Sequence, residues 1–165
     1  MRARFITCDV FTDRLFGGNP LAVFPDAGAI PESVLGAIAR EFNLSETVFV
    51  VSPHDPVNTA RLRIFTPQAE LPFAGHPTVG AAVLIAGLRA AALLKSQDLS
   101  VVLEEPIGAI ICTVSHRPGS VRKAHFIVPV QPSRSGLPQS SDLLADALGL
   151  TAADIGFDRH VPSVY

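Results

Sequence analysis

Residues 70–94 read ELPFAGHPTVGAAVLIAGLRAAALL, a short polar cluster followed by an almost wholly apolar run. Pro77 and Thr78 form a good helix start, because the first helical turn tolerates a residue without an N–H group. From Val79 to Leu94 the run is interrupted only by two glycines and Arg89. A helix that is apolar on every side must be enclosed by its own protein, so we expect a sheet to wrap around it.

Strand-like segments lie on both sides of this helix. Runs of β-branched and aromatic residues predict strands at 4–11, 21–24, 47–51 and 60–65 before it, and at 101–103, 109–114 and 125–130 after it. Helices are expected at 31–42 and 143–148, with a capping box at 151–154 and the beginning of a strand at 161–165. The predicted fold class is α+β, with a mixed β-sheet curled around a central apolar helix.

Composition limits the kinds of protein this chain can be. Its 165 residues and 17.4 kDa suit one globular domain, or one half of a two-lobed protein. Hydrophobic residues make up 48% and charged residues only 17%, against a usual charged share of about 25%. We therefore expect a folded chain with a large surface for a partner.

The charge, the cysteines and the missing motifs exclude several classes of function. A net charge of -2 offers no footprint for nucleic acid, and Arg89 cuts the apolar run too short for a membrane span. Cys8 and Cys112 sit in apolar strand-like runs, which indicates a reducing, cytoplasmic setting and no disulfide scaffold. The scattered histidines, without a C-x-x-C pair, predict no metal site, and no nucleotide-binding glycine loop is present.

The first polar cluster that could carry chemistry is Asn43-Leu44-Ser45-Glu46-Thr47, between a predicted helix and strand. Glu46 stands at the mouth of the strand beside apolar neighbours. Partial burial there would raise the pKa of its carboxyl and suit it to proton transfer. The alternative is a solvated glutamate in a turn.

The second cluster leads directly into the apolar helix. Gly75 permits close backbone approach, and the free N–H groups around His76, Thr78 and Val79 would point out of the positive end of the helix. Such an end is a cradle for a carboxylate or a phosphate. The alternative is that His76 and Thr78 only cap the helix.

Four motifs, in order, resemble the phenazine-biosynthesis PhzF-like family. They are Asp9-Val10-Phe11-Thr12, the segment FGGNPLAVF at 16–24, the segment AREFNLSETVF at 39–49, and RIFTP at 63–67 continuing to Gly75-His76-Pro77-Thr78. The motif-level resemblance covers residues 5–88, and beyond them it is general.

The resemblance implies one lobe of the two-lobed diaminopimelate-epimerase-like fold, with the active site between the lobes. It implies a cofactor-independent isomerase acting on a small carboxylate-bearing metabolite, with Glu46 as the acid/base residue and His76 as its catalytic partner. Asn19, Ser45, Gly75, Pro77 and Thr78 are expected to bind the substrate. No cysteine lies near either cluster, so the thiol chemistry of the epimerase relatives is not expected.

The chain departs from the family in length. Members are nearly twice as long, and nothing in residues 89–165 supplies the Asp and Gly-Ser segment of their second lobe. We therefore treat residues 1–165 as a single first lobe, and expect a homo-oligomer or a separate protein to bring the other half. The alternative is a non-catalytic module that keeps the anion cradle or serves as an interaction domain.

Overall fold

The computed structural model describes residues 2–128, 130–131, 133 and 140–156, which belong to two compact units, Met1–Pro129 and Val130–Tyr165. The first unit contains the strands β1 (Ile6–Val10), β2 (Asn19–Phe24), β3 (Glu46–Val51), β4 (Ala60–Phe65), β5 (Glu70–Leu71), β6 (Leu99–Glu105), β7 (Gly108–Ser115) and β8 (Lys123–Phe126), and the helices α1 (Glu32–Phe42), α2 (Gly75–Arg89) and α3 (Ala91–Leu94). The second contains α4 (Ser141–Leu148) and the 3₁₀ turn η1 (Ala152–Asp154).

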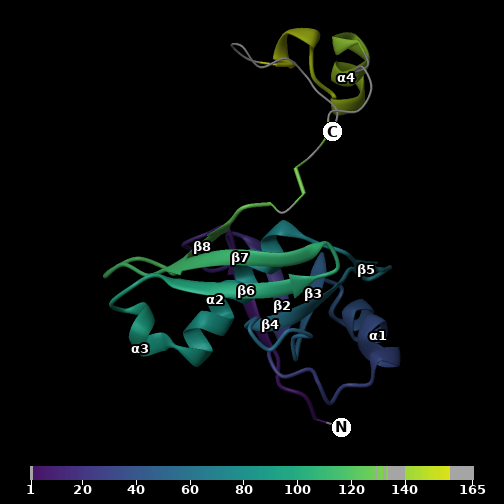
Figure 1. The fold of residues 1–165 in the computed structure, drawn as a ribbon. Coiled ribbons are helices and arrows are strands. Elements are labelled where there is room, and N and C mark those ends of the chain that lie inside the picture. The colour runs from purple at the N-terminus through teal and green to yellow at the C-terminus, as the bar shows by residue number, and fades with distance from the viewer. Residues whose placement is uncertain (1, 129, 132, 134–139, 157–165) are drawn as a thin grey trace. The chain divides into compact units, whose positions relative to one another are not determined.

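The strands of the first unit form one mixed sheet (Figure 1). Its order is β1-β2-β3-β4-β6-β7-β8, and β5 pairs with β4 off this path. The pairs β2–β3 and β4–β6 are parallel, and the other neighbouring pairs are antiparallel. Because β2 and β3 are parallel neighbours, their first residues lie at the same edge of the sheet, with Leu21 opposite Glu46.

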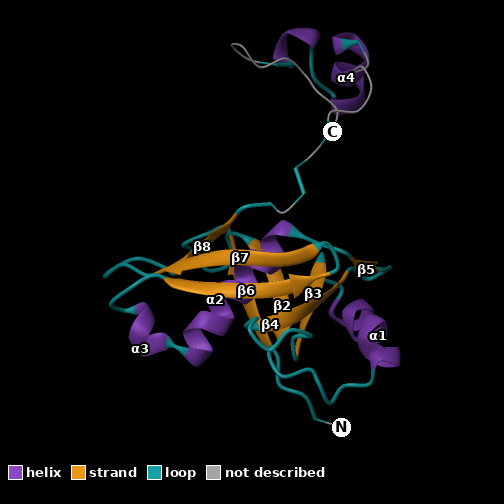
Figure 2. Ribbon diagram, viewed as in Figure 1, coloured by secondary structure: helices purple, strands orange, loops and turns teal. Residues whose placement is uncertain are grey.

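The sheet curls around α2, which contacts β1, β2, β3, β6, β7 and β8 (Figure 2). Buried residues of α2, such as Ala81, Ala82 and Ile85, pack with inward-facing residues of these strands in one core. A second cluster on the other face joins α1 to Phe24, Phe49 and Phe65. The predicted α+β class, with a mixed sheet around a central apolar helix, is confirmed.

Some element boundaries differ from the sequence prediction. The helix α2 starts at Gly75, before Pro77, because Ala74 already has extended backbone (φ -154°) and acts as the N-cap. The apolar run continuing to Leu94 is interrupted at Ala90, so a separate short helix α3 follows. The last strand covers Lys123–Phe126 instead of 125–130. The strand predicted at 161–165 lies outside the described residues.

The second unit begins as the sequence predicts. The Ser140 hydroxyl accepts a hydrogen bond from the Leu143 N–H, and Gly149 ends α4 in the left-handed conformation (φ 68°). The capping box is also present, with the Asp154 carboxylate accepting from both the N–H and the hydroxyl of Thr151. No helix in the described part of the chain is long and apolar enough to cross a bilayer.

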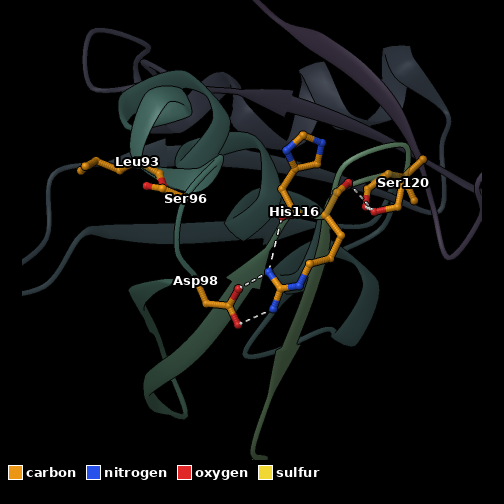
Figure 3. A network of polar contacts seen from close by, with 7 residues as sticks. Leu93, Ser96, Asp98, His116 and Ser120 are labelled. Atoms are coloured by element: carbon orange, nitrogen blue, oxygen red, sulfur yellow. Dashed lines mark hydrogen bonds and ion pairs between the residues drawn. The ribbon is translucent and has the colours of Figure 1, made fainter.

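A polar network fixes the β7–β8 connection of the first unit (Figure 3). The Arg117 guanidinium donates to both carboxylate oxygens of Asp98, at 2.7 and 3.2 Å, and to the carbonyl of His116. The Ser120 hydroxyl donates to the Arg117 carbonyl at 2.9 Å. Arg117 therefore ties this connection to the segment before β6, and the network contains none of the predicted site residues.

Candidate active site

Three elements bring Glu46 and His76 together. Glu46 is the first residue of β3, and Asn19 is the first residue of its parallel neighbour β2. His76 lies in the first turn of α2, and its Nε2 is 3.4 Å from Glu46 Oε2. Both side chains are largely shielded from solvent, at 16% exposed for Glu46 and 8% for His76. The two predicted catalytic residues are therefore neighbours at one edge of the sheet.

A hydrogen-bond chain orients the imidazole. The Ser45 hydroxyl donates to Asn19 Oδ1 at 3.0 Å, and Asn19 Nδ2 lies 3.2 Å from His76 Nδ1. With the amide nitrogen toward the ring, Nδ1 accepts and the proton of the neutral ring is on Nε2, whereas with the amide turned over Nδ1 donates to the amide oxygen. In both arrangements Nε2 is the ring nitrogen that faces Glu46.

The surroundings of His76 favour its neutral form. Burial lowers the pKa of the His76 ring, and the Glu46 charge and the Pro20 backbone offset this only in part. His76 Nε2 and Glu46 Oε2 are both buried and have no hydrogen-bond partner at their separation of 3.4 Å. Buried polar atoms are nearly always paired, so these two are the atoms of the site that a bound molecule could satisfy.

The start of α2 adds backbone donors beside His76. The N–H groups of Gly75 and His76 come before the first intrahelical acceptor, and an added Cβ at Gly75 would meet nothing within 4 Å. The sequence prediction of free amides at Thr78 and Val79 is wrong, because the helix starts earlier. The Thr78 N–H donates to Ala74 O at 3.2 Å, and Val79 lies inside the helix. Pro77 is buried and has no N–H to offer.

The hydroxyl of Thr78, a predicted substrate-binding residue, is engaged inside the protein. Thr78 is fully buried, and its hydroxyl lies 2.7 Å from both Ala74 O and Glu105 Oε1. Glu105, at the end of β6, belongs to no motif of the sequence. The strand alternation Val101, Leu103, Glu105 would have placed it on the buried face.

The β1–β2 connection reaches the same edge. The Phe11 ring centroid is 6.5 Å from that of His76, and Phe11 and Phe16 both have left-handed backbone (φ 63° and 62°). An added Cβ at Gly18 would lie 2.2 Å from Val10 O, so only glycine allows this loop to pass so close to β1. Gly18 directly precedes Asn19 and so sets where the hydrogen-bond chain begins.

A hollow of about 930 Å³ lies between β1, α2 and the β7–β8 connection, and Glu46 and His76 do not line it. Within the residues that the structure describes, no group of three or more acidic, histidine or cysteine side chains is placed to hold a metal ion.

A family model for phenazine biosynthesis-like proteins, PhzC-PhzF, matches residues 8–165. An uncharacterized isomerase of Mesorhizobium japonicum is 44% identical over 156 residues, which cover 94% of this chain and 50% of the relative. Trans-2,3-dihydro-3-hydroxyanthranilate isomerase of Pseudomonas fluorescens is 37% identical over 147 residues, covering 89% of this chain and 49% of the relative. The chain spans about half the length of these curated relatives.

Solved structures of similar proteins also match the fold of this chain. A predicted epimerase from Pseudomonas aeruginosa has a TM-score of 0.80 and 33% identity, covering 99% of this chain and 55% of the other. A PhzF-family protein from Bacillus anthracis has a TM-score of 0.71 and 28% identity, covering 94% of this chain and 50% of the other. These likenesses agree with the diaminopimelate-epimerase-like fold expected from the motifs.

Proposed function

Because the chain belongs to the phenazine biosynthesis-like PhzC-PhzF family, whose relatives include named isomerases, we propose that it carries the acid/base half of a cofactor-independent isomerase. The substrate would be a small metabolite bearing a carboxylate. The observation that supports this most is the contact between Glu46 Oε2 and His76 Nε2, two buried atoms 3.4 Å apart without hydrogen-bond partners.

In the proposed reaction Glu46 acts as the proton carrier. Its carboxylate takes a proton from a substrate carbon, and the electron pair of the broken C–H bond enters the conjugated system of the substrate. The protonated Glu46 carboxyl exchanges its proton with water and then delivers a proton to another carbon, so that the enzyme ends unchanged and the product carries a solvent proton. His76 Nε2–H, held toward Glu46 by Asn19 and Ser45, donates a hydrogen bond at the reacting centre and stabilises the negative charge that develops there.

The substrate carboxylate would lie at the start of α2. The Gly75 and His76 N–H groups are free of intrahelical partners, and the helix dipole makes this end partly positive. The open space beside Gly75 leaves room for the carboxylate to approach the backbone. In this proposal Asn19 and Ser45 act mainly by orienting His76, and Pro77 and Thr78 act by shaping the helix start.

Transfer of deuterium from solvent tests the proposal. In D₂O, the chain is incubated with trans-2,3-dihydro-3-hydroxyanthranilate, the compound named for its Pseudomonas fluorescens relative, and deuterium in the recovered material is measured. We expect incorporation by the wild type, and a reduction of about 100-fold or more in Glu46→Gln, which cannot cycle a proton. Glu41→Gln is the matched control, because Glu41 is exposed on α1.

Two outcomes count against the proposal. Full incorporation by Glu46→Gln would remove Glu46 from the reaction. No incorporation by a wild-type chain that still binds benzoate at Gly75 and His76 would favour the alternative, a non-catalytic carboxylate-binding module.

A further inference from the structure

A buried carboxyl group lies next to the first turn of α2, outside the contact between Glu46 and His76. Glu105, the last residue of β6, is only 6% exposed. Its Oε1 is 2.7 Å from the hydroxyl of Thr78, and its Oε2 is buried without a hydrogen-bond partner. An ionised carboxylate is rarely buried in this way without a cation, because removing the charge from water costs several kcal/mol.

The positions of the oxygens determine where the protons must be. Thr78 Oγ1 is 2.7 Å from Glu105 Oε1 and also 2.7 Å from Ala74 O. A hydroxyl has one proton, and a backbone carbonyl can only accept. If the Thr78 proton goes to Ala74 O, the short contact with Glu105 needs a proton from Glu105. A neutral Glu105 therefore satisfies both contacts, whereas an ionised one leaves two oxygens 2.7 Å apart with no proton between them.

The charged groups that line the same hollow as Glu105 make no ion pair with it among the described residues, although Arg61 Nε there is buried without a hydrogen-bond partner. The hollow of about 330 Å³ that it shares is also lined by His54, Arg61, Arg63, Glu70 and Glu104. Arg63 is paired with Glu70 at 2.7 Å and Glu32 at 3.0 Å, and Arg61 Nη1 lies 2.8 Å from His54 Nε2. Glu104 accepts from the backbone N–H groups of His54 and Asp55. Among the described residues, no ion pair to Glu105 is found.

Burial of the Glu105 side chain also favours its neutral form. It raises the pKa of Glu105 to about 7, against a smaller opposing effect of the Thr78 hydrogen bond. On the neighbouring strand β7, burial and then the Glu105 charge raise the pKa of the Cys112 thiol to about 11, so Cys112 brings no charge near neutral pH.

We propose that Glu105 is a neutral carboxylic acid that donates its proton to Thr78 and thereby anchors the first turn of α2. Thr78 connects Glu105 to the N-cap residue Ala74, because the Thr78 N–H and hydroxyl both donate to the Ala74 carbonyl. Glu105 is then a positioning residue for Gly75 and His76, which directly follow Ala74. The consequence for catalysis rests on the proposed function, but the anchoring does not.

A titration followed by carbon-13 NMR tests the protonation. The side-chain carboxyl signals of the glutamates are recorded against pH, and Glu105→Gln identifies the signal of Glu105. We expect a midpoint near 7, far above the ordinary glutamate value of about 4.3. A midpoint at or below the ordinary value would overturn the proposal. Through-bond correlation from the Glu105 backbone assigns the same signal in the wild type, so the measurement decides even if the variant folds poorly.

Hydrogen exchange tests the anchoring. Protection of the Thr78 and Val79 amides, corrected for intrinsic exchange, is compared at pH 6 and pH 8.5. In the wild type it should fall by about fivefold, the equivalent of one lost hydrogen bond, as Glu105 loses its proton. Glu105→Gln should show no such fall, because its amide can donate to Thr78 at either pH. Thr78→Val, which lacks the hydroxyl, should show low protection at both.

Glu41→Gln, on an exposed part of α1, should behave as the wild type does. The same fall in Glu105→Gln as in the wild type, or no fall in the wild type, would overturn the proposal. Neither measurement uses a substrate. Loss of deuterium transfer while these results hold would therefore count against the proposed function alone.

Discussion

Glu46 Oε2 and His76 Nε2 lie 3.4 Å apart where the start of β3 meets the first turn of α2, and neither atom is hydrogen-bonded within the protein. Nδ1 on the other side of the same ring is occupied by Asn19, so the imidazole can present only Nε2 to Glu46. The pair is held by secondary-structure ends, whose positions depend on the core, and this gives the site a fixed geometry.

Asn19→Asp should raise the pKa of His76. Burial holds the pKa of His76 below the value of a free histidine in the wild type, and a carboxylate beside Nδ1 would favour the charged ring. We expect the His76 midpoint, measured by NMR, to rise above about 6.5. Asn43→Asp, at the exposed end of α1, adds the same charge away from the ring and should leave the midpoint unchanged.

Asn19→Asp should also reverse the direction in which the His76 contribution to stability depends on pH. In the wild type the folded pKa of His76 is lowered, so its contribution to the free energy of unfolding is present above about pH 6.5 and is lost as the pH falls below that value. In Asn19→Asp the folded pKa is raised, so the contribution is present at low pH and lost as the pH rises. Urea unfolding at pH 5 and pH 8 measures the difference, and an unchanged pH dependence in the variant would contradict the assigned ring contact.

The sequence predicted the enclosure of α2 for a reason that the structure confirms. A helix with apolar residues all round has no face for solvent, so a curled sheet follows from its composition. The start of the helix was less predictable. Pro77 fits any position of the first turn, because no N–H there needs an intrahelical partner. No residue type in the sequence indicates that Ala74 has extended backbone and acts as the N-cap.

The pairing of Glu46 with His76 could not be obtained from spacing, because it depends on how β2, β3 and α2 converge. It was expected only from the resemblance to a family. Glu105 was missed although the alternation along β6 places it inward, because a glutamate before a Pro-Ile-Gly turn is usually read as solvated. Alternation along β6 predicts which face of the sheet the Glu105 side chain lies on. Its contact with Thr78 depends on how α2 packs against β6, which the alternation does not predict.

Gly18→Ala should destabilise the first unit and disturb the site. Its Cβ would lie 2.2 Å from the Val10 carbonyl, a backbone atom that cannot move without shifting β1. We expect a loss of about 2 kcal/mol or more in the free energy of unfolding, measured with urea, and movement of the Asn19 amide signals. Gly28→Ala, where an added Cβ meets nothing within 4 Å, is the matched control. Equal stability of the two variants would refute the close approach.

The β1–β2 connection should promote self-association. Phe11, Leu15 and Phe16 are 71%, 84% and 93% exposed on this loop beside the site. Large apolar side chains gathered in this way are typical of a docking face. We expect light scattering to show an oligomer at low micromolar concentration, and Leu15→Ser with Phe16→Ser to shift it toward monomer. Val57→Ser, at another 80% exposed apolar residue, is the control, and a wild type that is strictly monomeric would count against the prediction.

Gly75→Val should block carboxylate binding while leaving the helix intact. An added Cβ at Gly75 meets no atom of another segment within 4 Å, so the fold should accept valine there, yet the side chain would occupy the space through which a carboxylate reaches the Gly75 and His76 amides. We expect benzoate to shift the amide signals of these two residues in the wild type, and affinity to fall at least about tenfold in the variant. Gly36→Val, within α1 with only a flexible arginine end nearby, is the matched control for a valine in place of a glycine. Undiminished benzoate binding by Gly75→Val, or shifts confined to residues away from α2 in the wild type, would show that the start of α2 is not the carboxylate site.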